Sequence, residues 1–469
     1  MPLVAGVDLS TQSTKVEVRD ADTGTVVAAG RAPHPAVQPP RSEQDPAAWW
    51  TAFERAWAGA GSPVVDAIAV GGQQHGMVVL DSAGAVVRPA KLWNDTESAP
   101  DAGWLLKQLP DGAAGWAAAC GTVPVAAITI TKLSWLHRSE PESWERLARV
   151  LLPHDWLTHQ LTGAFTTDRG DASGTGYWSP AGGEYRWDLL AIVDKDRDWS
   201  SAVPSVLGPT TAAGTWRGAV VAPGTGDNMA AALALGLGPG DVAISIGTSG
   251  TVYAVSDTPT ADGTGDVAGF ADATGRFLPL VCTLNAAKVT DAVARLLGVD
   301  HGGLDTLALA TPPGAAGLVL LPYLDGERTP NRPDATGVLS GLRSDVSGGQ
   351  LARAAVEGVV CGLLDGLDAL SALVPTGGRL LLVGGGAESA AYRQVLADLA
   401  GRPVVVPAEG ELVAAGAAVQ AAAVLGGLAP TDVARHWATG GGTTTEPGPD
   451  AAAAADVRAA YAARRDAEA

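Results

Sequence analysis

A chain of 469 residues is longer than one hydrophobic core usually supports, so we expect two domains. The apolar fraction of 46% and the charged fraction of 17% are typical of a globular protein. A formal net charge of −19 argues against a surface that binds nucleic acid or an anionic membrane. An anionic ligand would therefore need a local site of backbone amides, hydroxyls and a bound cation.

The sequence also predicts a cytoplasmic protein without a membrane anchor. No apolar stretch reaches the roughly 18–20 residues that cross a bilayer. Asp8 interrupts the apolar N-terminus too early for a signal peptide. The cysteines (Cys120, Cys282 and Cys361) lie far apart in the chain, which favours buried thiols in a reducing compartment over disulfides.

The N-terminal segment predicts three strands, a helix and another strand. Strands are expected at 3–8, 14–19 and 25–30, with an Asp22-Thr23-Gly24 turn between the last two. Asp45-Pro46 is a typical helix start, and Trp49, Phe53 and Trp57 follow it at helical spacing. A buried strand at 64–70 then runs into Gly71-Gly72. This order predicts a mixed sheet flanked by helices.

The C-terminal half repeats this outline. Strands are expected at 241–247 and 250–256, helices around 286–297 and 350–374, and a strand at 379–383 that runs into three glycines. The Trp-rich segment 80–225 is interpreted as an elaboration of the first domain, and its tryptophans mostly as packing residues. We expect a loop at 440–450 and a terminal helix at 451–469.

One pattern occurs twice in the chain. Residues 4–14 resemble residues 242–251, and each copy is an apolar strand, a bend of small hydroxyl residues and a second strand. Such a bend suits phosphate, because small side chains let N–H groups and hydroxyls converge on an anion. Two copies predict two related half-domains that close on one nucleotide. Asp8 aligns with Ser245 of the second copy, which makes Asp8 a candidate for chemistry rather than folding.

A third element lies between the copies, at residues 221–232. Gly224 and Gly226 bracket a turn, and Asp227-Asn228 begin an apolar helix. An aspartate that caps the helix would explain the acid as well as a carboxylate that accepts a proton from a substrate hydroxyl. Asn228 adds a donor and an acceptor for a polyhydroxylated ligand.

Several segments, in this order along the chain, resemble the carbohydrate kinases of the FGGY family. They are Gly6–Lys15, Ser245–Gly250, Gly337–Leu342 with Gln350–Glu357 after it, and Leu382–Ala387. The resemblance runs from Gly6 to about Gly426 and implies an α/β fold. In that fold, the actin/hexokinase/Hsp70 ATPase fold, two ribonuclease-H-like domains surround an ATP cleft. It implies an N-terminal domain at 1–226, a C-terminal domain at 227–430, and a loop and helix at 431–469.

Other segments resemble the branch of the family that phosphorylates xylulose. They are Ser42–Trp50, Gly72–Gly76, Leu92–Asp95, Leu152–Trp156 and Leu321–Pro330. The resemblance implies ATP-dependent phosphorylation of a ketopentose, D-xylulose to D-xylulose 5-phosphate. Another sugar or polyol (ribulose, gluconate or a sugar alcohol) stays open, because Gln74 stands where several relatives have Met. A non-catalytic actin-like ATP-binding protein is disfavoured by Asp227.

The resemblance also implies roles for single residues. Asp227 is expected to be the general base, and Asp8 and Asp227 the carboxylates at Mg²⁺. The expected sugar pocket comprises Gln74, His75, Trp93, Asn94, Asp95 and Asn228. The expected nucleotide contacts are Thr11, Gln12, Ser13, Gly247, Thr248 and Ser249 at the phosphates, and Gly385 and Gly386 at the adenosine.

Three further expectations complete the sequence-based account. Lys15 is expected to point to solvent, and Asp168 and Asp171 are taken as solvated residues of a polar loop. The expected partners are ATP and a small-molecule sugar, with no nucleic acid and no membrane. A homodimer stays open.

Overall fold

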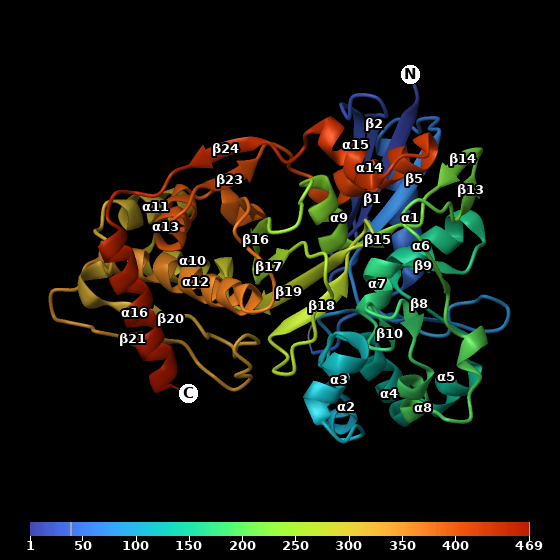
Figure 1. The fold of residues 1–469 in the computed structure, drawn as a ribbon, viewed down its shortest axis with the longest axis horizontal. Coiled ribbons are helices and arrows are strands. Elements are labelled where there is room, and N and C mark those ends of the chain that lie inside the picture. Colours follow the sequence, from blue (N-terminus) through green and yellow to red (C-terminus); the bar gives the residue numbers. More distant parts are fainter. Residues whose placement is uncertain (38–39, 469) are drawn as a thin grey trace. The chain divides into compact units, whose positions relative to one another are not determined.

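The computed structural model describes residues 1–37 and 40–468, which divide into two compact units (Figure 1). Unit 1 comprises Met1–Leu237, Asp257–Leu278 and Glu409–Gly440, and unit 2 comprises Gly238–Ser256, Pro279–Ala408 and Gly441–Ala469. Two segments from the C-terminal half of the chain therefore pack with unit 1. The domain boundaries after residues 226 and 430 stay a prediction.

Unit 1 is built on a mixed sheet with the strand order β13-β14-β5-β1-β2-β3, and β15 also pairs with β5. Strand β1 pairs with β2 antiparallel and with β5 parallel. The predicted strands at 3–8, 14–19 and 25–30 are confirmed, and the strand expected at 64–70 lies slightly later. The strands are β1 (Leu3–Leu9), β2 (Ser13–Asp20), β3 (Val26–Pro33), β5 (Ala67–Gly72), β13 (Gly214–Trp216), β14 (Ala219–Val221) and β15 (Thr225–Gly226).

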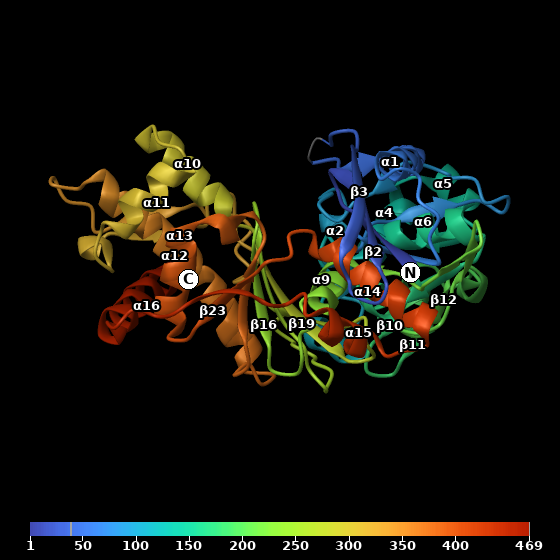
Figure 2. The same cartoon turned by 90° about the horizontal axis from the view of Figure 1, so that it is seen from above.

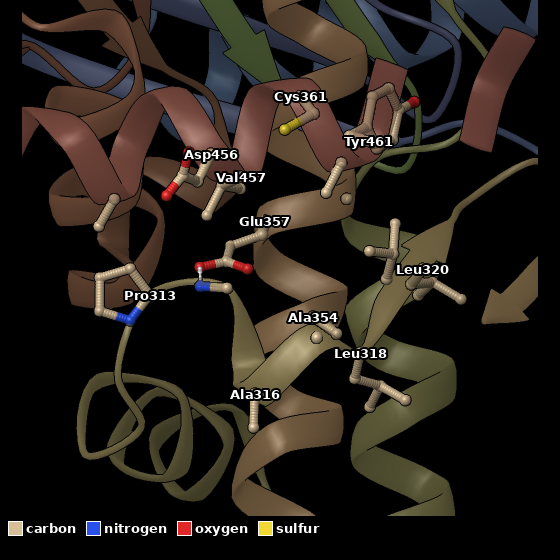
Figure 3. A pocket seen from close by; sticks show the side chains of 16 residues that line it. Pro313, Ala316, Leu318, Leu320, Ala354, Glu357, Cys361, Asp456, Val457 and Tyr461 are labelled. Atoms are coloured by element: carbon tan, nitrogen blue, oxygen red, sulfur yellow. Dashed lines mark hydrogen bonds between the residues drawn. The ribbon is translucent and has the colours of Figure 1, made fainter. Parts of the chain in front are cut away.

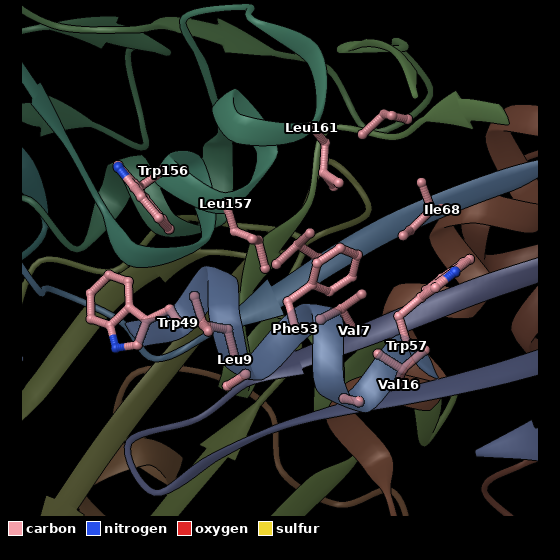
Figure 4. Packing of buried hydrophobic residues seen from close by; sticks show 14 of the residues in the cluster. Val7, Leu9, Val16, Trp49, Phe53, Trp57, Ile68, Trp156, Leu157 and Leu161 are labelled. Atoms are coloured by element: carbon pink, nitrogen blue, oxygen red, sulfur yellow. The ribbon is translucent and has the colours of Figure 1, made fainter. Parts of the chain in front are cut away.

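Helix α1 (Pro46–Gly59) covers one face of this sheet. Asp45 accepts a hydrogen bond from Ala47 N and Pro46 opens the helix, as the sequence predicts. Trp49, Phe53 and Trp57 point from α1 into a core that also contains Val7 and Ile68 (Figure 4). Replacing one such buried aromatic side chain by alanine typically costs about 3–5 kcal/mol.

Helix α14 (Leu412–Gly426) covers the opposite face (Figure 2). It approaches β1 so closely that a Cβ added to Gly6 would lie 1.8 Å from Ala414 O. Since side chains alternate along a strand, Val7 faces α1 while Gly6 faces α14. The glycine is therefore required by the close approach of a helix backbone.

The Trp-rich elaboration accounts for most of the rest of unit 1. Trp116, Trp144 and Trp199 lie in a second apolar cluster, whereas Trp93, Trp104 and Trp187 are more than a third exposed. The main elements of unit 1 outside its central sheet, α1 and α14 are β6 (Val78–Leu80), α2 (Ala99–Leu106), α3 (Gly112–Cys120), α4 (Thr129–Ser139), α5 (Pro141–Arg146), β8 (Arg149–Leu151), α6 (Pro153–Thr162), β9 (Thr166–Asp168), α7 (Arg169–Ser173), α8 (Trp187–Val193), α9 (Asp227–Ala234), β18 (Val267–Ala271) and α15 (Pro430–Trp437).

Unit 2 contains strands in the order β19-β17-β16-β22-β23-β24, with β19 (Phe277–Thr283) entering it from residue 279. The remaining elements are β16 (Val242–Ile246), β17 (Gly250–Ala254), α10 (Ala287–Leu297), α11 (His301–Leu309), β20 (Val319–Leu321), β21 (Val338–Ser340), α12 (Gly348–Ser371), β22 (Leu380–Val383), α13 (Ala390–Ala400), β23 (Val404–Pro407), β24 (Gly442–Thr445) and α16 (Ala451–Ala467).

Two predictions at the C-terminus have different outcomes. The loop expected at 440–450 is wrong in part, because Gly442–Thr445 form β24, which pairs antiparallel with β23. Three consecutive β-branched threonines were the missed signal. The helix expected at 451–469 is confirmed as α16, and Ala469 lies outside the described residues.

The repeated pattern has the same strand pairing in both units. In unit 1, Asp8 on β1 is paired with Lys15 on antiparallel β2 and with Gly71 on parallel β5. In unit 2, Ser245 on β16 is paired with Thr251 on antiparallel β17 and with Val383 on parallel β22. The predicted correspondence of the two halves is therefore present in the topology as well as in the sequence.

In the described part of the chain, no helix taken alone has the length and apolar character to cross a membrane. The pair α14 and α15, bent by 119°, passes that test together on length and composition only.

Candidate active site

Asp8 lies near the end of β1 and is almost fully buried, at 3% exposure. Its Oδ2 lies 3.3 Å from Lys15 Nζ, which also contacts Glu411 at 2.5 Å. The prediction that Lys15 points to solvent is wrong, because the flanking carboxylates hold the ammonium. Burial raises the pKa of Asp8 to about 6, although Lys15 lowers it. Asp8 Oδ1 is buried with no hydrogen-bond partner among residues 1–37 and 40–468.

Asp227 is the first residue of α9, and Gly226 is the N-cap, so the aspartate does not cap its own helix. Asp227 Oδ1 accepts hydrogen bonds from Asn228 N (2.8 Å) and Asn228 Nδ2 (2.9 Å). Burial, and then the negative charge of Asp8, raise the pKa of Asp227 to about 7. The charge of Asp8 therefore acts on Asp227, and burial raises the pKa of both carboxyl groups.

The amide of Asn228 also connects this carboxylate to Gln74. Asn228 Nδ2 donates to Gln74 Oε1 at 2.8 Å. The opposite end of that side chain, Gln74 Nε2, is buried without a hydrogen-bond partner in the described part of the chain. A buried donor without a partner costs free energy, which a ligand oxygen would recover. Hydrogen bonds thus connect three predicted site residues in the order Gln74, Asn228 and Asp227.

His75 adopts a positive φ of 65°, which is uncommon for a residue with a side chain. Its Nδ1 lies 2.8 Å from Gly174 O, and Thr129 Oγ1 donates to His75 O at 3.1 Å. Because a carbonyl only accepts, Nδ1 carries hydrogen and the neutral ring would accept at Nε2. The backbone and the ring are therefore fixed by α4 and by the end of α7.

The first phosphate bend is tied to the tryptophan predicted to line the sugar pocket. Trp93 Nε1 donates to Thr11 Oγ1 at 3.0 Å, and this hydroxyl donates to Gln73 Oε1 at 3.0 Å. Gln12 is exposed, whereas Ser13 is buried at the start of β2. Sequence reasoning did not single out Gln73, although it stands inside the Gly72–Gly76 segment.

Asn94 and Asp95 follow Trp93 but differ in surroundings. Asp95 is buried, and its oxygens bind Lys91 Nζ (2.9 Å) and Ser42 N (2.9 Å). The same ammonium also contacts Glu43 and Glu97, so this acidic group already holds a cation. Asn94 is half-buried, and its Oδ1 meets no hydrogen-bond partner within the described residues. Their roles in sugar binding stay predictions.

In unit 2, the second phosphate bend lies against the start of α10. The carbonyl oxygens of Gly247 and Thr248 accept from Ala287 N (2.9 Å) and Ala286 N (3.3 Å). Gly247 N donates to Ser249 O at 3.0 Å, which closes the bend between β16 and β17. The bend is therefore braced by the following helix, and the Thr248 side chain is exposed.

The two glycines predicted at the adenosine differ in packing. A Cβ on Gly386 would lie 2.2 Å from Ile246 Cγ2, whereas one on Gly385 would meet no described heavy atom within 4 Å. Gly386 is thus required by packing inside unit 2, and Gly385 has open space beside it. The segment Gly385–Glu388 forms a 3₁₀ turn, and α13 begins only at Ala390.

A cavity of about 320 Å³ lies in unit 2 between α12, α16 and the chain before β20 (Figure 3). Glu357 accepts from Gly314 N at one end, and Cys361 and Tyr461 line the other. The residues that line it include none of the predicted site residues.

Sequence reasoning did not identify a buried cluster of one histidine and three aspartates. His154 lies between Asp155 and Asp171, and Asp168 is nearby; all four are at most 4% exposed. The prediction that Asp168 and Asp171 are solvated is wrong. The Leu152–Trp156 segment was noted for its resemblance, but its partners lie further along the chain and only the fold brings them together.

Comparison with known proteins identifies the chain's relatives. Residues 3–234 match the N-terminal domain, and residues 242–425 the C-terminal domain, of the FGGY family of carbohydrate kinases. The chain belongs to this family. As a carbohydrate kinase of the FGGY family, it takes ATP as the phosphate donor.

Individual FGGY relatives extend over nearly the whole chain. A xylulose kinase of Streptomyces coelicolor is 50% identical over 453 residues, which cover 94% of this chain and 92% of the relative. A xylulose kinase of Streptomyces rubiginosus is 50% identical over 457 residues, covering 95% and 92%. The crystal structure of xylulose kinase from Bifidobacterium adolescentis is 43% identical, with a TM-score of 0.87 and 99% of each chain covered. The two-domain α/β fold is therefore the actin/hexokinase-like ATPase fold of FGGY kinases.

Proposed function

We propose that this FGGY kinase transfers the γ-phosphate of ATP to D-xylulose and forms D-xylulose 5-phosphate. The 50% identity with two xylulose kinases over more than nine-tenths of the chain supports this substrate. A xylulose kinase of known structure is 43% identical, and the match covers 99% of each chain, which supports the same substrate.

The observation that carries the proposal is the hydrogen-bonded row Gln74–Asn228–Asp227. Both hydrogen bonds from Asn228 to the Asp227 carboxylate go to Oδ1, so Oδ2 is the atom that would accept the proton of the sugar hydroxyl. Gln74 Nε2, a buried donor, would bind a sugar oxygen beside it. Phosphoryl transfer needs mainly positioning and charge stabilisation, so a fixed carboxylate beside an aligned hydroxyl is sufficient.

The remaining sugar contacts would come from His75, Trp93, Asn94 and Asp95. Trp93 is 38% exposed and is anchored at Nε1, so its ring can form an apolar wall for the sugar. His75 is held at Nδ1, which would direct its Nε2 toward a sugar hydroxyl. Asp95 would act by holding Lys91 and the loop after Trp93.

The residues of unit 1 fit a magnesium ion. Asp8 Oδ1 is a buried carboxylate oxygen without a partner in the described residues, and the negative charge of Asp8 raises the pKa of Asp227. We propose that Asp8 and Asp227 hold Mg²⁺, directly or through water, since this ion prefers oxygen ligands and keeps several waters. When bound, the ion would neutralise charge on the transferred phosphate.

The nucleotide contacts would be divided between the units. In unit 1, the backbone of Thr11, Gln12 and Ser13 would meet phosphate, since the Thr11 hydroxyl is already bonded twice. In unit 2, Gly247, Thr248 and Ser249 would do the same, and the open side of Gly385, with Gly386 behind it, would lie at the adenosine. We also propose a cytoplasmic location, which the buried thiols of Cys120 and Cys361 support.

A substrate panel tests the sugar. In a coupled assay of ADP release, we expect kcat/KM to be highest for D-xylulose and at least tenfold lower for D-ribulose, gluconate, ribitol and glycerol. Higher kcat/KM for any of these would replace xylulose as the proposed substrate.

The Asp227→Asn variant tests the base. It keeps the size of the side chain and removes the negative charge, so we expect kcat to fall about 10²–10⁴-fold while the Kd of ATP changes by less than a few-fold. Turnover within tenfold of the unmodified enzyme would remove Asp227 from the mechanism.

A further inference from the structure

The buried His154 interacts with carboxylates at both ring nitrogens. Nδ1 lies 2.6 Å from Asp171 Oδ2, and Nε2 lies 3.2 Å from Asp155 Oδ1 and 3.9 Å from Asp168 Oδ1. Nδ1 is hydrogen-bonded to Asp171, whereas Nε2 makes no hydrogen bond among the described residues and meets Asp155 and Asp168 at ion-pair distance, which favours a positively charged ring. That form is the imidazolium cation.

The surrounding charges favour the same state. Burial alone would lower the pKa of His154, but Asp155, Asp171 and Asp168 together raise it to about 10. Of the other titratable groups near these carboxylates, Tyr177 and Tyr185 are kept protonated and neutral because burial raises the pKa of each, and Asp227 adds negative charge near Asp171. The cluster therefore holds one buried cation among three carboxylates.

This cluster contacts the segment that leads into Asp227. A Cβ on Gly224 would lie 2.5 Å from His154 Cδ2, so the backbone of Gly224 packs directly on the ring. Thr225 Oγ1 donates to Asp168 Oδ2 at 2.7 Å. On the other side of the segment, Gln420 of α14 exchanges hydrogen bonds of 2.9 and 3.0 Å with the backbone of Gly224. These contacts therefore fix Gly224 and Thr225, which lie three and two residues before Asp227, and so fix the backbone that leads to Asp227.

The cluster also supports the backbone that holds His75. Asp168 caps α7 by accepting from Gly170 N (2.8 Å) and Asp171 N (2.9 Å). The helix ends at Gly174, whose carbonyl accepts from His75 Nδ1 and whose Cβ, if present, would lie 2.5 Å from that ring. One buried charge cluster therefore connects to both His75 and Asp227.

We propose that His154 is a positioning residue for phosphoryl transfer: as an imidazolium hydrogen-bonded to Asp171 and in an ion pair with Asp155, it fixes Gly224–Thr225 and α7, and so aligns Asp227 and His75 with the sugar. This inference rests on the proposed role of Asp227. His154 itself touches neither sugar nor nucleotide in this arrangement.

A metal ion is the competing occupant, because His154, Asp155 and Asp171 offer ligand atoms within reach of one another. The separation of 2.6 Å between Nδ1 and Asp171 Oδ2 is a charge-assisted hydrogen bond, and an imidazolium has no lone pair to give a metal. The geometry points to a proton at this place rather than a metal.

The first test breaks the connection without touching the charged residues. Thr225→Val removes the bond to Asp168 and keeps the side-chain shape; we expect kcat per folded enzyme to fall about 10- to 100-fold with the KM of ATP unchanged. Thr158→Val is the matched control, since Thr158 is buried on α6 and its hydroxyl has no hydrogen-bond partner among the described residues. We expect that control to keep kcat within twofold.

The results separate alignment from mere stability and from the proposed base. A merely structural role would lower the melting temperature of Thr225→Val and leave kcat per folded molecule unchanged, which would overturn the inference. If Thr225→Val is unimpaired while Asp227→Asn is inactive, only the positioning role fails. If Asp227→Asn stays active, the proposed base fails instead.

The second test reads the protonation state directly. The chain has 7 histidines, so nitrogen-15 NMR of histidine-labelled enzyme can resolve His154, assigned with a His154→Asn variant. We expect two protonated ring nitrogens from pH 7 to pH 9, unchanged by a chelator. A single protonated nitrogen at pH 7, or a signal that shifts when the chelator is added, would overturn the proposal.

Discussion

Trp93 Nε1 donates a 3.0 Å hydrogen bond to Thr11 Oγ1, across 82 positions of the chain. The indole predicted to line the sugar pocket is thereby anchored to the bend predicted to bind phosphate. Thr11 Oγ1 in turn donates to Gln73 Oε1, next to Gln74 of the sugar pocket. The Thr11 hydroxyl therefore connects residues of unit 1 that are predicted to bind sugar with residues that are predicted to bind nucleotide.

Replacing Thr11 by valine removes both bonds and keeps the shape of the side chain. A typical hydrogen bond contributes about 0.5–1.5 kcal/mol, so we expect the KM of the sugar to rise about 2- to 12-fold. Steady-state kinetics at saturating ATP measure this change. Thr51→Val, on the exposed side of α1, is the control and should leave KM unchanged. An unaltered sugar KM in Thr11→Val would mean that Trp93 needs no anchor.

The raised pKa of Asp227 predicts a pH dependence of catalysis. The group is neutral below its pKa of about 7 and ionised above it, and only the ionised form accepts a proton. At saturating ATP, we expect kcat/KM for the sugar to fall about tenfold per pH unit below pH 7 and to level off above about pH 8. The residual activity of Asp227→Asn should lack this limb. A flat profile of the unmodified enzyme from pH 5.5 to 9 would contradict the assignment.

Local signals explain what could be predicted of the fold. Asp45-Pro46 and the spacing of Trp49, Phe53 and Trp57 are contained within a few residues, and α1 begins where they indicate. The repeated strand-bend-strand pattern likewise predicted both central hairpins. β24 was missed because Gly442–Thr445 gain their strand conformation from pairing with β23.

The site could be predicted only where its residues lie in recognisable segments. Asp8 and Asp227 lie next to glycines and other small residues, which indicate a bend in the chain. His154, Asp168 and Thr225 belong to separate segments, and Gln420 contacts Gly224 across 196 positions. A polar stretch such as 168–173 has the composition of a solvated loop; its burial depends on packing against α6 and β15, which composition does not encode.

The close contact between β1 and α14 predicts that a single added methyl group at Gly6 destabilises unit 1. A Cβ at Gly6 would lie 1.8 Å from Ala414 O and 2.6 Å from Ala418 N, both backbone atoms of α14. We expect Gly6→Ala to destabilise unit 1 by about 3 kcal/mol, since the helix has to move away from the sheet. Calorimetric melting measures the loss.

Gly59→Ala is the matched change in the same unit. Gly59 lies inside α1, and an added Cβ would be 3.5 Å from its nearest neighbour, Gly30 Cα. Alanine is the better helix former, so we expect stabilisation of about 0.5–1 kcal/mol. Equal melting temperatures for Gly6→Ala and the unmodified enzyme would show that α14 does not press on β1.

Alanine substitutions of the two glycines after β22 should have different effects in unit 2. One should affect packing, and the other should affect nucleotide binding. Gly386→Ala would place a Cβ 2.2 Å from Ile246 Cγ2, so we expect a lower melting temperature, equivalent to about 1–3 kcal/mol. Gly385→Ala meets no described atom within 4 Å and should melt as the unmodified enzyme does. If adenosine approaches the backbone at Gly385, the added methyl group occupies its place, and the KM of ATP should rise at least about fivefold while the KM of the sugar stays constant. Kinetics with ATP as the varied substrate decide this, because an unchanged KM of ATP in Gly385→Ala would move the adenosine away from this turn.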